Sequence, residues 1–82
     1  MTIRLHPCRD MASSARLRVL FEKPSDREYL QEVLGNHGYD QVGFHDLPDT
    51  PLVHVDVFGA NCEGLYRALD DDDEFEWVDS NK

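Results

Sequence analysis

The chain has 82 residues, of which 40% are hydrophobic and 30% are charged, and its formal net charge is −9 at pH 7. This length suits a single domain with a modest core. The negative charge disfavours direct binding to nucleic acid or anionic membranes and favours cationic protein surfaces. No run approaches the roughly 20 apolar residues of a membrane span, and the N-terminus lacks the apolar core of a signal peptide.

The charge is unevenly distributed along the sequence. Residues 1–38 carry a net charge of +1, whereas residues 39–82 carry −10. Aspartate outnumbers glutamate by eleven to six, and arginine outnumbers lysine by six to two. This bias is typical of a salt-adapted proteome or of a GC-rich genome such as that of a phage, and composition leaves both open.

Two cysteines, Cys8 and Cys62, form no Cys-x-x-Cys pair. Cys8 falls in an expected N-terminal tail, and Cys62 falls on the buried stripe of an expected helix. We therefore expect two free thiols in a cytoplasmic protein. A packing role for Cys62 is favoured over a reactive one, because no histidine can be placed beside it from the sequence.

The first 22 residues combine an irregular segment with a strand. Residues 1–15 have no hydrophobic period and contain Pro7, so we expect a flexible arm. The alternative is that Ile3 and Leu5 add an edge strand to the sheet. Residues 16–22 alternate between apolar and polar side chains, which predicts a half-buried strand.

A helix is predicted to follow Pro24. Ser25 and Glu28 have the spacing of a capping box. The apolar side chains after them recur at helical spacing and predict a buried stripe, which contains Tyr29, Leu30, Val33 and Leu34.

Two strands are predicted in the middle of the chain. Residues 39–45 form the first, with Val42 and Phe44 inward. Residues 46–51 form a loop that contains two prolines. Residues 52–58 show the clearest alternation in the chain, with valine at every second position, and predict the second strand.

The C-terminal third is predicted to hold a helix and a short strand. Asn61 is a good N-cap, and the helix should end in the aspartate run. Residues 74–78 form the last strand, with Phe75 and Trp77 inward. Residues 80–82 are a tail.

This order of elements predicts one α+β domain over residues 16–79. Strand, helix, strand, strand, helix, strand is the split-βαβ, ferredoxin-like arrangement. Right-handed crossovers then predict a four-stranded antiparallel sheet in the order 4-1-3-2, with both helices on one face. Arg18 is expected to pair with Glu76 across neighbouring strands.

The order also resembles that of ACT-type regulatory domains. Residues 19–34 (VLFEKPSDREYLQEVL) resemble the first strand and helix of that family, and residues 52–69, which contain HVDVFG, resemble its third strand and second helix. The resemblance implies a homodimeric regulatory domain that binds an amino acid or another small ligand. The Gly-x-Leu turn of the family is replaced here by Arg27-Glu28-Tyr29-Leu30, so no ligand residue is carried over.

The motifs of enzymes are missing from the sequence. There is no Gly-x-Ser-x-Gly, no phosphate-binding glycine loop and no His-Glu-x-x-His. His45, His54 and Asp56 could approach one another on the open face of the sheet and bind a divalent metal, but a solvated polar face is favoured. We therefore expect a protein that is not an enzyme and that carries no cofactor.

An acidic run between residues 70 and 79 departs furthest from average composition. Seven of its ten residues are acidic. Carboxylates at the end of a helix oppose its dipole and repel one another. The run therefore costs stability, and it could serve solubility, protection of an edge strand, or binding.

The binding interpretation is that spaced carboxylates imitate phosphates and occupy the basic groove of a nucleic-acid-binding protein. Small phage inhibitors that act by DNA mimicry, including anti-CRISPR proteins, are similar in size and charge. The residues predicted to bind the partner are Asp70, Asp71, Asp72, Asp73, Glu74, Glu76 and Asp79, with Asp40, Asp46, Asp49 and Asp56 as extensions. The alternatives are an ACT-like ligand sensor and a salt-adapted domain whose acidity serves solvation.

Overall fold

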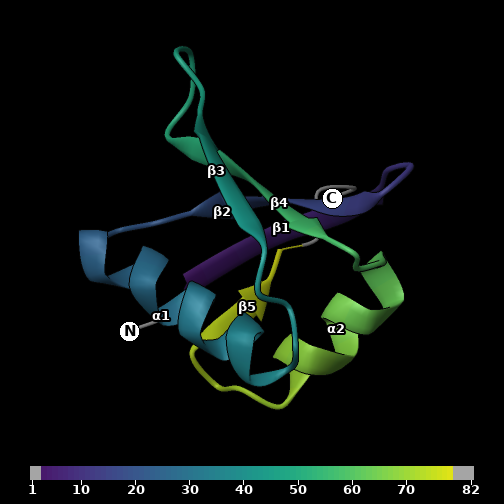
Figure 1. The fold of residues 1–82 in the computed structure, drawn as a ribbon. Helices are drawn as coiled ribbons and strands as arrows, with labels where there is room; N and C mark the ends of the chain where they lie inside the picture. Colours follow the sequence, from purple (N-terminus) through teal and green to yellow (C-terminus); the bar gives the residue numbers. More distant parts are fainter. Residues whose placement is uncertain (1–2, 79–82) are drawn as a thin grey trace.

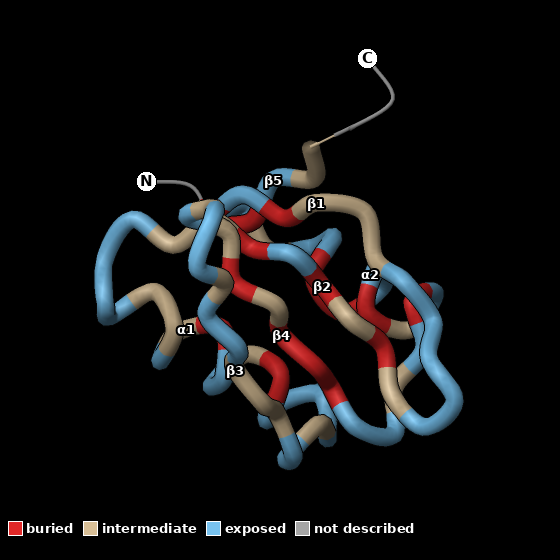
Figure 2. Tube along the Cα trace, turned by 90° about the horizontal axis from the view of Figure 1, so that it is seen from above, coloured by how far each residue is buried: buried red, intermediate tan, exposed pale blue. Residues whose placement is uncertain are grey.

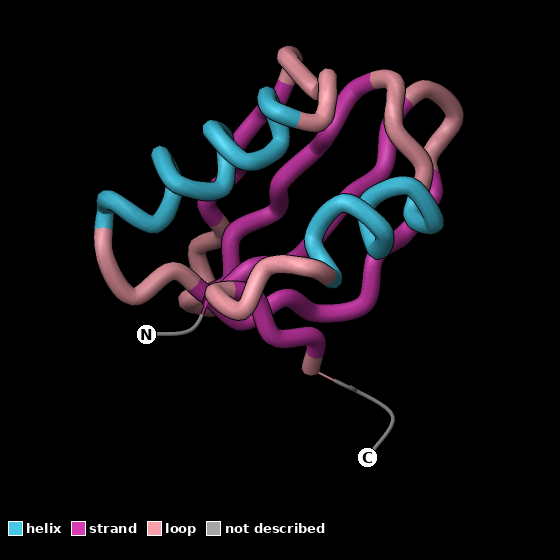
Figure 3. Tube along the Cα trace, turned by 90° about the horizontal axis from the view of Figure 1, so that it is seen from below, coloured by secondary structure: helices cyan, strands magenta, loops and turns pink. Residues whose placement is uncertain are grey.

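The structure, a computed structural model, describes residues 3–78 and combines a five-stranded mixed sheet with two helices. Both helices cover the same face of the sheet (Figure 1, Figure 3). The strands lie in the order β3-β4-β2-β1-β5. The elements are β1 (Ile3–Asp10), β2 (Ser14–Leu20), α1 (Pro24–Asn36), β3 (Val42–Asp46), β4 (Leu52–Phe58), α2 (Cys62–Asp70) and β5 (Phe75–Trp77).

The prediction of a four-stranded antiparallel, ferredoxin-like sheet is wrong, because β1 is a fifth strand inside the sheet. β1 pairs antiparallel with β2 and parallel with β5. The four expected strands keep their relative order. β1 lies between β2 and β5, which were expected to be neighbours. Arg18 therefore lies opposite His6 and His54, while Glu76 lies opposite Arg4, so the expected Arg18–Glu76 pair does not form.

Residues 3–10, which were expected in a flexible arm, are ordered by burial of their apolar side chains. Ile3 and Leu5 are 3% and 0% exposed. Pro7 was the signal against a strand, but it lies where the register of β1 against β2 shifts, between His6 and Arg9. A bulge tolerates a residue that cannot donate to the ladder.

The core lies between the sheet and the helices, and the alternation along β2 and β4 supplies most of it. β2 and β4 pair over their full lengths, and the side chains that point away from the open face are buried (Figure 2). The fully buried large side chains come from β1, β2, β4 and both helices: Leu5, Leu17, Val19, Leu30, Leu34, Val55, Val57, Leu65 and Leu69.

The two helix starts differ in how well the sequence predicted them. The Asn61 cap of α2 is confirmed, since its side chain accepts a hydrogen bond from the Gly64 backbone N–H at 2.7 Å. The Ser25–Glu28 capping box is wrong. Helix α1 begins earlier, at Pro24, and the Asp26 carboxylate accepts the backbone N–H groups of Glu22 and Lys23, each at 3.2 Å.

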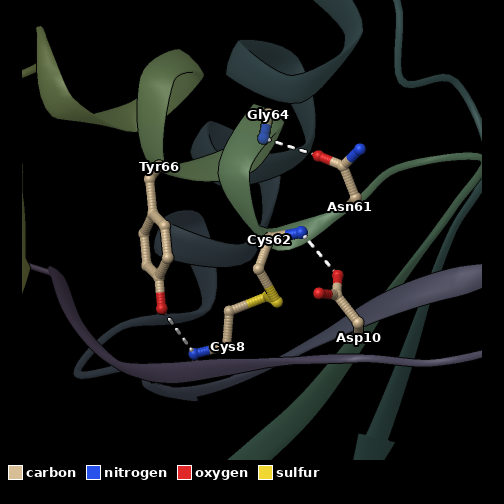
Figure 4. The surroundings of a disulfide bond; sticks show 6 residues. All are labelled: Cys8, Asp10, Asn61, Cys62, Gly64 and Tyr66. Carbon is tan, nitrogen blue, oxygen red and sulfur yellow. Dashed lines mark hydrogen bonds between the residues drawn. A yellow bond between two sulfur atoms is a disulfide. The ribbon is translucent and has the colours of Figure 1, made fainter.

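A disulfide joins Cys8 to Cys62, so the expectation of two free thiols is wrong (Figure 4). The bulge turns Cys8 toward α2, and nearby the Asp10 carboxylate accepts the Cys62 backbone N–H at 2.8 Å. The Tyr66 hydroxyl accepts the Cys8 backbone N–H at 3.3 Å. Because both cysteines are bonded to each other, they do not indicate a cytoplasmic location.

Among residues 3–78, no helix is both long enough and apolar enough to cross a membrane.

The disulfide closes a long loop, because its cysteines are 54 residues apart. We predict that the double variant Cys8→Ser, Cys62→Ala loses about 3–4 kcal/mol of its free energy of unfolding, because the unfolded chain regains its loop entropy. Urea denaturation measures this loss, and wild type under a reductant should approach the variant. Two titratable thiols in wild type, unfolded without reductant, would contradict the assignment.

Candidate functional site

The acidic residues predicted to bind a partner are grouped where α2 passes into β5, at the lower edge of Figure 1. Asp70 is the last residue of α2 and Asp71 is its C-cap. Residues 72–74 form the connection to β5, which carries Glu76. All of these side chains are exposed except that of Asp72, which is half-buried. Asp79 lies outside the described residues.

Asp72 has a structural role that the sequence did not reveal. One of its carboxylate oxygens accepts the Tyr29 hydroxyl at 2.6 Å, and the other accepts the Glu74 backbone N–H at 2.9 Å. The Tyr29 ring also stacks on Phe75, with 5.7 Å between centroids. Asp72 therefore ties the connection to α1 and to the start of β5.

The same contact changes the acidity of Tyr29. The hydrogen bond to Asp72, together with burial and the negative charges of Asp72, Glu74 and Glu32, raises the pKa of Tyr29 to about 12. A carboxylate that accepts this bond stabilises the protonated phenol. The proton of Tyr29 is thus held between α1 and the connection.

The acidic area continues onto α1. A shallow hollow of about 370 Å³ is lined by Asp26, Glu28 and Glu32 of α1 together with Glu74. A second hollow, of about 490 Å³, lies beside residues 71–74 and is also lined by Val33 and His37. We call residues 70, 71, 73, 74 and 76, with Glu28 and Glu32, the acidic surface. Glu28 and Glu32 are four residues apart and therefore lie on one face of α1. This spacing could have placed α1 in the predicted acidic surface from the sequence.

The predicted extensions of the acidic run lie elsewhere in the fold. Asp46 pairs with Arg27. Asp49 belongs to the β3–β4 loop, at the opposite end of the molecule from residues 70–74 in Figure 1. Asp56 lies on the open face of the sheet, where Arg16 holds it. Asp40 is exposed in the connection between α1 and β3.

The open face of the sheet has a different charge. The register places His6, Arg18, His54 and His45 side by side across β1, β2, β4 and β3. The neighbouring row contains Arg9, Arg16, Asp56 and Gly43. Cations thus gather on the face that the helices leave uncovered, on a chain whose net charge is −9.

Arg16 and Asp56 form the strongest ion pair on this face. The guanidinium donates two hydrogen bonds to the two carboxylate oxygens, at 2.6 and 3.1 Å. The bonds to Arg16 hold the pKa of Asp56 below its ordinary value although burial opposes the shift. The carboxylate therefore stays charged and keeps Arg16 fixed in the sheet.

The three residues considered as metal ligands do come together. His45 and His54 are paired in register, and His45 Nε2 lies 3.3 Å from the Asp56 carboxylate. Both oxygens of that carboxylate are bonded to Arg16, whose charge repels a cation. Within residues 3–78, no group of three His, Cys, Asp or Glu side chains has the geometry to hold a metal ion.

No protein-family model, no curated protein and no solved structure matches this chain.

We predict opposite effects for two adjacent aspartates. Asp72→Ala should lower the free energy of unfolding by about 1–3 kcal/mol, because two hydrogen bonds to a charged acceptor are lost. Asp71→Ala removes a negative charge at the C-terminus of α2 and should leave stability unchanged or raise it by a few tenths of a kcal/mol. Urea denaturation of both variants checks this, and equal losses would show that Asp72 is not an anchor.

Tyr29 should make stability depend on pH in the alkaline range. The unfolded chain releases this proton near pH 10.0, whereas the folded protein holds it until about pH 12. The contribution of Tyr29 to the free energy of unfolding is therefore fully present below pH 10 and is lost as the pH rises through 12. Absorbance at 295 nm should show one late tyrosine step, and Tyr29→Phe should remove it. A late step that survives in Tyr29→Phe belongs to another tyrosine.

Proposed function

We propose that this protein is a non-catalytic inhibitor or regulator whose acidic surface docks on a basic, nucleic-acid-binding surface of a partner protein. The observation that carries the proposal is the group of exposed carboxylates at the end of α2, on the connection and on β5, at residues 70, 71, 73, 74 and 76. Asp72 ties the connection to α1. Carboxylates held in place lose less conformational entropy on binding than those of a loose acidic tail.

The placement of these charges supports a role beyond local stability. Asp70 and Asp71 end α2, where negative charge opposes the helix dipole. Glu76 points from β5, the short strand at the edge of the sheet. A charged edge strand also resists pairing with another sheet. The acidic surface therefore suits a cationic partner that binds through side chains.

The exposed carboxylates can be tested apart from the structural one. The triple variant Asp70→Asn, Asp71→Asn, Asp73→Asn keeps Asp72, and the control Glu22→Gln, Asp49→Asn, Glu63→Gln makes the same change in net charge at exposed positions elsewhere. In a fluorescence titration with an arginine-rich peptide, we expect the triple variant to bind at least about tenfold more weakly than the control.

A partner captured from a lysate by wild type should be released by duplex DNA and by added salt, and the triple variant should not capture it. Equal binding by the triple variant and the control would show that only net charge matters, which contradicts a docking surface. Unfolding at low salt with recovery in concentrated KCl would instead show that the acidity serves solvation in a salt-adapted protein.

A further inference from the structure

A cationic hollow lies on the open face of the sheet, away from the helices. Its volume is about 480 Å³. It is lined by Pro7, Cys8, Arg9, Arg16, Arg18 and His54, and we call it the arginine hollow. Its size falls within the range of small-molecule sites.

Strand register builds the arginine hollow from three strands. The bulge in β1 brings Arg9 opposite Arg16 of β2, on the open face. Arg18 of β2 lies opposite His54 of β4. Pro7 and Cys8 form one wall, and the disulfide fixes that wall to α2. The three guanidinium groups are therefore carried by paired backbone rather than by a loop.

The positive charge in the hollow is only partly neutralised. Arg16 is paired with Asp56. Among the described residues, Arg9 and Arg18 take part in no ion pair. Arg16 uses two of its five N–H donors on Asp56, so the others stay available to a ligand.

The pKa of His54 responds to its burial and to the charges that surround the hollow. Burial lowers its pKa most, and the charges of Arg16, Arg18 and His45 lower it further, while Asp56 acts in the opposite direction. The imidazole is thus neutral at neutral pH and can both donate and accept a hydrogen bond. An anion in the hollow would favour the protonated form.

We propose that the arginine hollow binds the phosphate group of a small phosphomonoester. Such a group carries a charge of about −1.5 to −2 at pH 7, which matches the two guanidinium groups that lack an ion pair. Arginine forks donate paired hydrogen bonds to phosphate oxygens. A nucleic acid is a poorer fit, because the net charge of −9 repels a long polyanion more strongly than it repels one phosphate.

The arginine hollow does not depend on the proposed docking function. Apart from Glu76, which lies opposite Arg4 on the open face at the sheet edge, the acidic surface lies on the helices and the α2–β5 connection, whereas the hollow opens on the other face of the sheet. Substitutions at residues 70, 71 and 73 leave the arginine hollow intact, and substitutions of Arg9 or Arg18 leave those carboxylates intact. The docking proposal and the phosphate proposal can therefore fail independently.

The test is a titration of the full chain with inorganic phosphate and with glycerol phosphate at low, fixed ionic strength, followed by NMR of the histidine side chains. We expect saturable shifts at His54, assigned with His54→Gln, and a rise in its pKa when ligand is bound. Arg18→Gln should weaken binding about tenfold. Arg67→Gln makes the same charge change on the exposed side of α2, beside Glu63, and should bind as wild type does.

Arg9→Gln is a second variant on another strand and should also weaken binding. Equal weakening by Arg67→Gln would show that phosphate responds only to net charge, which overturns the site. Binding of acetate as tight as that of phosphate would overturn the phosphate assignment. Binding of oligothymidylate that strengthens with its length, with the same His54 shifts, would identify a nucleic-acid surface and overturn the small-ligand proposal.

Discussion

The bulge in β1, fixed by the disulfide to α2, decides what each face of the molecule presents. One added residue between His6 and Arg9 reverses the alternation of the strand. Without it, Cys8 and Asp10 would point to the open face and Arg9 would point toward the core. With it, Cys8 bonds to Cys62, Asp10 accepts a backbone N–H at the start of α2, and Arg9 joins the arginines of β2.

The fold separates most charged residues by face rather than by position along the chain, with Asp56 and Glu76 as acidic residues on the open face. The sequence showed a nearly neutral first half and an acidic second half. In the structure, the acidic side includes Glu28 and Glu32 from the first half, while His54 and Asp56 of the second half lie among the arginines of the open face. Two surfaces of opposite charge on one small domain can take different ligands, since attraction at each depends on nearby charges.

Local pattern was sufficient to predict most elements but not their connection into a sheet. The strand predicted at residues 52–58 has the bounds that the structure gives β4, and the Asn61 cap is confirmed. β1 was expected only as the alternative to a flexible arm, and then at the sheet edge, because Pro7 interrupts its alternation after only Ile3 and Leu5. Its internal position depends on β2 and β5 pairing on either side of it, which no local pattern in residues 3–10 reveals. The disulfide was missed for the same reason, since Cys8 approaches α2 only once β1 is placed.

The sequence predicted which region is acidic, but it did not predict which of the acidic residues has a structural role. Seven acidic residues in ten identify the region, yet nothing in four consecutive aspartates distinguishes Asp72 from its neighbours. The distinction comes from α1, whose Tyr29 hydroxyl donates a hydrogen bond to Asp72. This bond offsets part of the repulsion within the run, because one carboxylate gains a donor and fixes the turn. The carboxylates beside it gain no such bond among the described residues, so Asp70 and Asp71 oppose the dipole of α2 without a compensating hydrogen bond.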